Sequence, residues 1–150
     1  MIANYLDKYV ATQAGISLAI LVLTPFARFH SLVLQTVGFL LLIIGFLIFI
    51  IAVKQLGVAF IPVVTPVEKA QLVTSGIYGV VRHPIYTGLI TLAIGWSIFW
   101  GSPFSFIASL GLILFFHFKT KKEEMLLSKK YSEYAQYKAK VKNKIIPFIY

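Results

Sequence analysis

Residues 29–53 form an apolar run of 25 residues without a single Asp, Glu, Lys or Arg. A helix that crosses the hydrocarbon core of a bilayer needs about 20 such residues. Residues 9–27 and residues 83–118 are two further uncharged runs of sufficient length. Since 59% of the chain is hydrophobic, the sequence predicts an all-α integral membrane protein and not a soluble one.

The longest of these runs, residues 83–118, exceeds one ordinary span and is interrupted at Gly101-Ser102-Pro103. Gly and Pro mark turns between helices, so we expect two helical arms that fold back as a tight hairpin. No linker rich in Pro, Gly or Ser divides the 150 residues, which suffice for one domain. The sequence therefore predicts a single domain with about four transmembrane helices, at residues 9–27, 29–53, 84–100 and 103–118.

Small residues recur at seven-residue intervals along the second run, at Gly38, Gly45 and Ala52. This spacing places them on one face of a helix, where the backbone of another helix can approach closely. We interpret the two glycines as helix-packing residues.

The basic residues are distributed very unevenly. With four spans, both termini and the connection at residues 54–81 share one side, which then holds thirteen of the fourteen Lys and Arg residues. Basic residues are retained on the cytoplasmic side of a membrane, so we expect both termini in the cytoplasm. A Lys-rich tail beside a bilayer meets anionic headgroups, which accounts for the net charge of +9 without nucleic acid as a partner.

Several kinds of site are excluded by composition. The chain has no Cys, so it forms no disulfide, no thiolate metal site and no Cys nucleophile. Its three His residues, His30, His83 and His117, lie in separate regions of the sequence. We therefore expect neither a metal centre nor a haem site.

The cytoplasmic tail, residues 119–150, contains an amphipathic pattern. Apolar and aromatic residues with helical spacing are Leu127, Tyr131, Tyr134 and Val141, with Tyr137 nearby. The pattern predicts a C-terminal amphipathic helix that either continues the last span or folds back near it. Such a helix anchors the tail at the membrane surface, and the sequence leaves open whether it also closes over a functional site.

A first polar cluster, Arg82 and His83, precedes the third apolar arm. Pro84 suits the first turn of a helix, with His83 near its cap. Backbone N–H groups at that helix end, together with the Arg82 guanidinium, form an anion site suited to a carboxylate or phosphate. Alternatively, Arg82 reaches lipid headgroups and His83-Pro84 is an ordinary helix start.

A second polar cluster, Glu123 and Glu124, follows the fourth apolar arm. The neighbouring lysines can neutralise it as a solvated charge run. However, a hairpin brings both clusters to the same end, where a ligand with one anionic and one cationic group would match them. Adjacent residues point about 100° apart on a helix, so we expect one glutamate to face the ligand and the other to bind a neighbouring donor.

Two motifs carry a resemblance to a known family: Arg-His-Pro-Ile-Tyr-Thr-Gly at residues 82–88, and Glu123-Glu124 followed by Leu127. With Leu-Val-Thr-Ser-Gly-Ile-Tyr at residues 72–78, they resemble the isoprenylcysteine carboxyl methyltransferases and their prokaryotic relatives. The resemblance covers about half of the chain, residues 72–147. Phospholipid methyltransferases and membrane sterol reductases share parts of these motifs.

This chain departs from the family pattern at two places. Tyr131-Ser132 stands where the family usually has Phe-Gly, and Gly79 stands where a larger residue is common. Neither departure removes a charged group, but the tail can turn differently.

The resemblance implies an S-adenosylmethionine site between hairpin and tail, with S-adenosylhomocysteine as the product. Arg82 and His83 suit the carboxylate of the cofactor, and Glu123 or Glu124 suits its amine or its ribose hydroxyls. Arg82 and Glu124 are the expected catalytic pair. Tyr86, about one helical turn after Arg82, can present its ring or hydroxyl to the same pocket.

The implied cofactor site has two further candidates. Gly88 leaves room for a close approach, which helix packing explains equally well, and Tyr78 lies in the connection. The chain contains no Gly-rich Rossmann loop, so a soluble-type cofactor site is excluded.

The resemblance implies an O-methyltransferase of a prokaryotic inner membrane that acts on a lipid-borne acceptor, expected to be a carboxylate. Three alternatives stay open at this stage. The first is a phospholipid N-methyltransferase-like enzyme, the second a nicotinamide-dependent membrane reductase, and the third a non-catalytic membrane assembly protein.

Overall fold

The computed structural model describes residues 2–26, 28–57 and 71–146, with side chains described from residue 8 onward. Within these residues the structure is helical and has no strand. Its elements are α1 (Ile2–Leu23), α2 (Leu32–Leu56), the 3-10 helix η2 (Gly76–Gly79), α3 (Pro84–Phe99), α4 (Pro103–Lys130) and α5 (Tyr134–Lys140). The predicted all-α class is confirmed.

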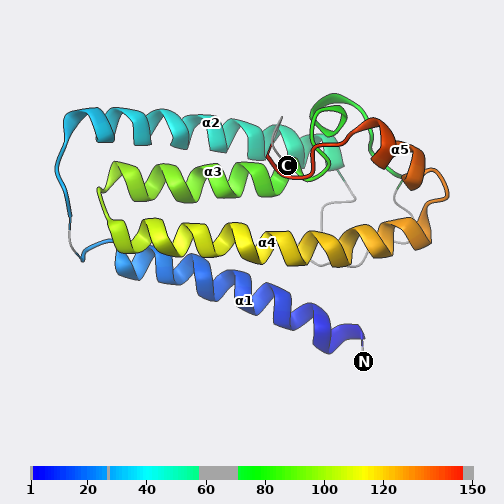
Figure 1. Ribbon diagram of the computed structural model, residues 1–150, viewed down its shortest axis with the longest axis horizontal. Helices are drawn as coiled ribbons and strands as arrows, with labels where there is room; N and C mark the ends of the chain where they lie inside the picture. The colour runs from blue at the N-terminus through cyan, green and yellow to red at the C-terminus, as the bar shows by residue number, and fades with distance from the viewer. Residues whose placement is uncertain (1, 27, 58–70, 147–150) are drawn as a thin grey trace.

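The four long helices lie side by side in the order α2, α3, α4, α1 (Figure 1). Each runs antiparallel to the helix that precedes it in the chain. The end of the bundle where α1 begins and α4 ends also carries η2 and α5. Helix α3 packs most extensively against α2, and α4 packs against both α1 and α3.

Glycines allow the close approach of α2 and α3. A Cβ added to Gly38 would lie 2.3 Å from the backbone nitrogen of Phe99, and one added to Gly45 would lie 2.7 Å from that of Leu92. From α3, a Cβ on Gly88 would lie 2.8 Å from the backbone nitrogen of Phe49. Such distances leave no room for a side chain, so the predicted small-residue face of residues 29–53 is confirmed.

The ends of the first two helices differ from the apolar runs. Helix α1 is already helical at Ile2 and ends at Leu23, because Pro25 disfavours helical backbone at the residue before it. Helix α2 begins at Leu32, where the hydroxyl of Ser31 caps it by accepting a hydrogen bond from the N–H of Leu34 at 3.5 Å. An apolar run therefore marks where a helix can cross a membrane and not where it begins.

The turn between α3 and α4 lies where the sequence predicts it. Gly101 has a φ of 59°, a left-handed conformation that favours glycine. A Cβ at Gly101 would also collide with the carbonyl of Phe29, because the chain before α2 is bonded to this turn. Ser102 then caps α4 by accepting from the N–H of Ser105 at 3.3 Å.

Helix α4 continues without interruption to Lys130, twelve residues beyond the predicted end of the last apolar arm at residue 118. Residues 119–130 contain no Gly or Pro, so nothing in this segment stops the helix. Glu123 and Glu124 consequently project from the same rigid helix as the apolar arm, and not from a separate tail.

The tail folds back, which is one of the two arrangements that its sequence pattern allows. Helix α4 stops at Tyr131, whose backbone is extended (φ −113°, ψ 115°), and α5 starts at Tyr134. The amphipathic residues do pack together, but from two helices instead of one. This small cluster contains Tyr134, Tyr137 and Val141 with Leu72, Leu127 and Tyr131.

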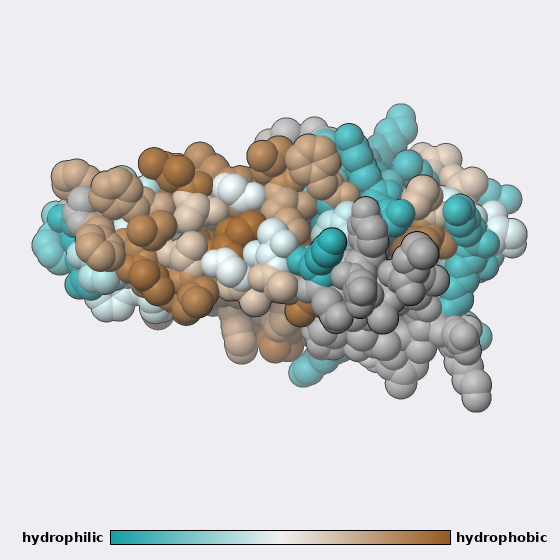
Figure 2. All heavy atoms as spheres, turned by 90° about the horizontal axis from the view of Figure 1, so that it is seen from below, coloured by the Kyte–Doolittle hydropathy of each residue, from teal (hydrophilic) through white to brown (hydrophobic). Residues whose placement is uncertain are grey.

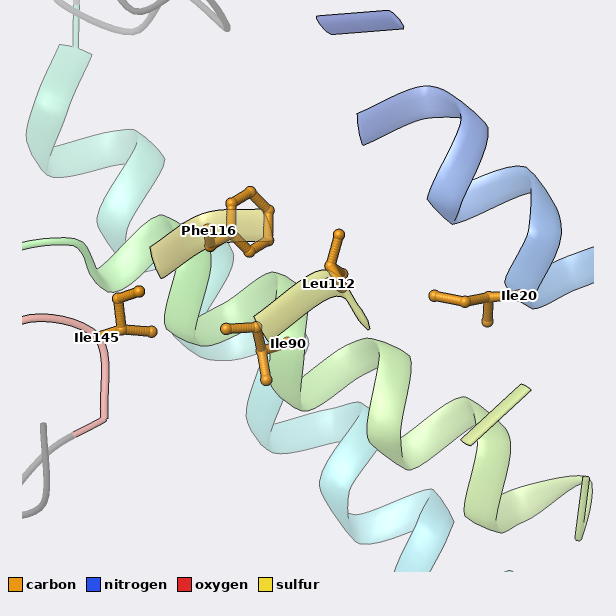
Figure 3. Packing of buried hydrophobic residues seen from close by; sticks show 5 residues of the cluster. All are labelled: Ile20, Ile90, Leu112, Phe116 and Ile145. Carbon is orange, nitrogen blue, oxygen red and sulfur yellow. The ribbon is translucent and has the colours of Figure 1, made fainter. Parts of the chain in front are cut away.

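The main core lies between α1, α3 and α4. Figure 3 shows Ile20, Ile90, Leu112 and Phe116 with Ile145, which reaches this cluster from the segment after α5.

Outside the core, the bundle is covered by exposed apolar side chains. Figure 2 shows them along its middle, while hydrophilic residues gather at the end that carries α5.

Two helices, α2 and α4, are long and apolar enough to cross a membrane. The apolar part of α1 (Lys8–Leu23) and α3 (Pro84–Phe99) are shorter. At 1.5 Å per residue, 16 residues in α3 reach about 24 Å, less than the hydrocarbon core of about 30 Å.

Candidate functional site

The two polar clusters meet at one end of the bundle. Arg82 Nε lies 2.9 Å from Oε1 of Glu124, and both side chains are buried. Arg82 comes just before α3, whereas Glu124 lies near the end of α4. The predicted juxtaposition therefore occurs, and it takes the form of a direct ion pair.

Arg82 also holds the segment after α5. Its Nη1 donates to the carbonyls of Val141 at 2.6 Å and Lys142 at 2.7 Å. The backbone N–H of Arg82 donates to Asn143 at 3.0 Å, and that of His83 donates to Lys144 at 2.9 Å. The sequence predicts that backbone N–H groups at this helix end face an anion, but those of Arg82 and His83 do not. They are instead bonded to the chain's own carbonyls, because the tail folds onto this helix end.

His83 lies between the two glutamates. Its Nδ1 is 3.5 Å from Oε2 of Glu123, and its Nε2 is 3.3 Å from Oε1 of Glu124. A protonated imidazole donates from both nitrogens, so His83 can bridge the two carboxylates. All three side chains are buried.

Tyr86 joins this cluster to the core of the bundle. Its hydroxyl donates to Oε1 of Glu123. Its ring stacks on Phe116 with a centroid distance of 4.2 Å and on His83 with a centroid distance of 5.8 Å. Tyr86 therefore lies between the charged cluster and Phe116 of the core.

Two tail residues that the sequence analysis did not assign to the site complete it. Lys138 Nζ lies 2.9 Å from Oε2 of Glu124, although half of its side chain is exposed. Tyr134 is 1% exposed, and its hydroxyl has no hydrogen-bond partner within the described part of the chain. Burial, followed by the nearby Glu124, raises the pKa of the Tyr134 hydroxyl, so it is a protonated donor without an acceptor.

The sequence contains only part of the information needed to assign Lys138 and Tyr134 to the site. Lys138 is one of nine lysines in the tail, and no neighbouring residue in the sequence marks it as different from the others. Tyr134 belongs to the amphipathic pattern, but that pattern does not show where α5 docks.

Gly88 and Tyr78 lie beside the cluster without contacting its carboxylates. Gly88 faces α2, where its lack of a side chain allows close packing. The Tyr78 hydroxyl donates to the carbonyl of Ala52 on α2 at 3.3 Å, and the Tyr78 carbonyl accepts from Tyr137 at 2.7 Å. Burial raises the pKa of Tyr78. For Gly88, the packing explanation is the one that the geometry supports.

Another cation, Lys119, lies on the core side of Tyr86 and is 1% exposed. Its Nζ donates to Oε1 of Gln13 on α1 at 2.9 Å and lies 5.1 Å from the centroid of the Tyr86 ring. The sequence pattern does not single it out, because Lys119 begins a Lys-rich segment that reads as solvated.

The chain is similar to known membrane enzymes. A family model described as phospholipid methyltransferase matches residues 33–134. A probable protein-S-isoprenylcysteine O-methyltransferase from Oryza sativa subsp. indica is 35% identical over 107 residues, which cover 67% of this chain and 56% of that protein. A Delta(14)-sterol reductase from Mus musculus is 32% identical over 98 residues, or 63% of this chain and 22% of that protein.

Among solved structures, the eukaryotic intramembrane Ras methyltransferase, an isoprenylcysteine carboxyl methyltransferase, matches with a TM-score of 0.72 and 25% identity. The match covers 95% of this chain and 53% of that one. The chain thus spans about half the length of the methyltransferases that it matches. Together with the apolar helices, this likeness identifies an integral membrane protein.

The family match covers more than half of the chain and includes both motifs of the buried cluster. The predicted resemblance to the isoprenylcysteine carboxyl methyltransferases is confirmed by the rice relative and by the structural likeness. This chain belongs to the phospholipid methyltransferase family.

Proposed function

We propose that this protein transfers a methyl group from S-adenosylmethionine to the carboxylate of a lipid-borne acceptor. The observation that carries the proposal is the buried cluster of Arg82, His83, Glu123 and Glu124 at one end of an apolar bundle. Charged groups inside an apolar helical bundle are costly and are usually kept for function. The names of the similar proteins supply the class of reaction.

The residues of the cluster fit the cofactor. Nη2 of Arg82 makes no hydrogen bond within the described part of the chain, so it can donate to the carboxylate of the methionyl group. The unpaired Tyr134 hydroxyl is a second donor beside the cluster. Glu123 and Glu124 can accept from the amine or from the ribose hydroxyls.

When bound, the cofactor supplies a methyl group on a positively charged sulfur. A carboxylate acceptor is ionised at pH 7, so it would take the methyl group without a general base from the chain, and S-adenosylhomocysteine would leave as a neutral thioether. The work of the protein is then to align the two reactants and to exclude water. Arg82 and Glu124 orient the cofactor, and the segment held by Arg82 covers the site.

For the membrane arrangement we propose four spans with α3 and α4 as a hairpin and both termini in the cytoplasm. The Lys-rich end of α4 and α5 then faces the anionic headgroups of that side. On this arrangement the cluster lies at the cytoplasmic mouth of the bundle, where a water-soluble cofactor and a lipid acceptor can meet. A prokaryotic inner membrane is the proposed location.

A nicotinamide-dependent reductase is the second candidate, favoured by the similarity to Delta(14)-sterol reductases. The buried glutamates argue against it, because two carboxylates repel the phosphates of a dinucleotide. Titration of the purified protein with the reduced dinucleotide separates the two classes. Saturable binding of the dinucleotide, without binding of S-adenosylhomocysteine, would favour the reductase.

The proposed activity is tested with purified protein in lipid nanodiscs, methyl-labelled S-adenosylmethionine and N-acetyl-S-farnesylcysteine. We expect label to enter the lipid phase as a base-labile methyl ester, and Glu124→Gln to abolish this transfer. The carboxamide of the same lipid is the matched control, because it offers no carboxylate. Base-stable label on a lipid amine would indicate N-methylation instead.

A further inference from the structure

Lys119 is a buried cation that the proposed chemistry does not use. It lies on α4, where that helix contacts α1 and α3, and its side chain is 1% exposed. One neutral acceptor, Gln13 Oε1, lies 2.9 Å from its ammonium nitrogen. The ring centroids of Tyr86 and Phe116 lie 5.1 and 6.0 Å away.

Lys119 has no carboxylate within 4.0 Å among the residues whose side chains are described. Glu123, one turn further along α4, attracts the ammonium electrostatically, but its oxygens are bound by Tyr86 and His83 and form no direct ion pair with Lys119. An ammonium has three donor hydrogens, and Gln13 takes one of them. A buried charge is costly unless it is paired and hydrogen-bonded, so an anion in direct contact with the remaining donors would stabilise the Lys119 ammonium.

An open groove lies between α1 and α4, and neither Lys119 nor Gln13 lines it. It is lined by Lys8, Tyr9 and Thr12 of α1 and by Phe115 of α4. Phe115 precedes Lys119 by one turn on α4, and Tyr9 precedes Gln13 by one turn on α1, so each pair shares a helix face. The groove therefore lies near the Lys119–Gln13 pair, and a ligand in it reaches the buried ammonium when that pair opens.

We propose that Lys119 binds the anionic head of the lipid-borne acceptor, whose hydrocarbon chain occupies the groove between α1 and α4. This inference rests on the proposed methyl transfer and adds the residue that recognises the charge of the acceptor. A carboxylate would pair with the ammonium and form charge-assisted hydrogen bonds with it. A neutral head would leave the ammonium unpaired, so the site selects against neutral lipids.

The position of Lys119 relative to the cluster supports this role. Its ammonium lies over the ring of Tyr86, and the hydroxyl of that ring is bonded to Glu123. One tyrosine thus separates the proposed acceptor site from the proposed cofactor site. Methyl transfer needs the reacting atoms about 3–3.5 Å apart, so the Tyr86 side chain must move aside before the two reactants meet.

The test measures binding, and not turnover, of N-acetyl-S-farnesylcysteine and its carboxamide to the full-length protein in detergent. We expect the wild type to bind the carboxylate about 10-fold or more tightly than the amide, since a charged hydrogen bond is the only difference. Lys119→Met should abolish this preference, whereas Lys119→Arg should keep most of it. Lys121→Met is the matched control, because Lys121 is exposed on the same helix. This variant should prefer the carboxylate over the amide as strongly as the wild type does.

Thermal unfolding on the same samples separates binding from structure. A lysine that serves only the fold would lower the melting temperature when replaced. Removing a buried ammonium that has no carboxylate in direct contact should instead leave the melting temperature of Lys119→Met close to that of the wild type. Lys119→Gln is a second neutral variant, for the case that the methionine side chain of Lys119→Met does not fit the buried position. If both neutral variants fail to fold, Lys119 is structural and the proposal is overturned.

The proposal is also overturned if Lys119→Met keeps the preference for the carboxylate, or if the wild type shows none. Binding of S-adenosylhomocysteine to each variant distinguishes this failure from that of the proposed function. If Lys119→Met binds S-adenosylhomocysteine and still prefers the carboxylate over the amide as the wild type does, only the role of Lys119 is refuted. Absent cofactor binding in the wild type would refute the methyltransferase, whatever the lipid preference.

Discussion

Arg82 Nε lies 2.9 Å from Glu124 Oε1, although 42 residues separate them in the chain. The same guanidinium donates to the carbonyls of Val141 and Lys142. One side chain therefore joins the start of α3, the end of α4 and the segment after α5. This arrangement gives Arg82 two roles, because the residue proposed to orient the cofactor also binds the segment after α5.

Replacing Arg82 should consequently affect stability as well as binding. Arg82→Ala leaves the Glu124 carboxylate with His83 and Lys138 as its partners among the described residues. Removing one member of a buried pair costs about 3–5 kcal/mol. We expect a clear fall in melting temperature together with loss of S-adenosylhomocysteine binding. Thermal unfolding in detergent and isothermal titration provide the two readouts.

Arg82→Lys is the matched variant for this prediction. Lysine keeps the charge but has no planar fork that reaches Glu124 and two carbonyls together. Its melting temperature should lie between those of the wild type and Arg82→Ala. An Arg82→Ala protein that melts like the wild type would show that the ion pair contributes nothing to holding the tail.

The Tyr86 hydroxyl is the donor that reaches Glu123 from α3. Tyr86→Phe keeps the stacking on Phe116 but leaves the buried carboxylate with one donor fewer, which costs about 1–3 kcal/mol. We expect weaker binding of S-adenosylhomocysteine and a moderate loss of stability, measured as above. Tyr86→Leu should lose more stability, because it also removes the stacked ring. Equal stability of the two variants would contradict this account.

The packing of α2 on α3 predicts a sharp difference between two glycines. A Cβ at Gly45 would lie 2.7 Å from the backbone nitrogen of Leu92, so Gly45→Ala should destabilise the protein by about 1–3 kcal/mol. Gly111 has no atom within 4 Å of such a Cβ, so Gly111→Ala should stabilise α4 by up to about 1 kcal/mol. Melting temperatures that fall equally in both variants would argue against close contact of the two helices.

Tyrosines of the folded-back tail predict a loss of stability in alkali. Burial raises the pKa of Tyr137 to about 12, whereas an unfolded tyrosine has a pKa of about 10. Between these values the unfolded state loses its proton first, so stability is complete below pH 10 and falls as the pH rises toward 12. Melting temperatures measured across this range should decline less steeply in Tyr137→Phe. An identical slope would mean that Tyr137 is accessible to solvent in the native protein.

The apolar runs and motifs of the sequence predict most of the architecture. Uncharged runs locate the long helices, Gly101 marks the turn between α3 and α4, and the spacing of Gly38 and Gly45 indicates the α2 contact. These features are local, or repeat along one helix, so they can be recognised before the partner helix is known. The meeting of Arg82 with Glu124 follows from the hairpin alone.

Other parts of the site depend on long-range docking that no local pattern contains. The end of α4 cannot be inferred from hydropathy, because helical backbone continues through the Lys-rich segment after Phe118. The position of α5 decides that Lys138 pairs with Glu124 and that the Tyr134 hydroxyl is buried. Lys119 is buried because it lies against Gln13 of α1 and the rings of Tyr86 and Phe116. One lysine in a basic run shows no sign of such neighbours.

The central claim is that the buried cluster is a cofactor site, and titration of S-adenosylhomocysteine into the purified protein tests it most directly. Wild type should bind the nucleoside saturably at one site per chain. Glu124→Gln, which keeps the size of the side chain but removes its charge, should bind it at least about 10-fold more weakly while remaining folded. Absence of saturable binding in the wild type, or equal affinity in Glu124→Gln, would contradict the account.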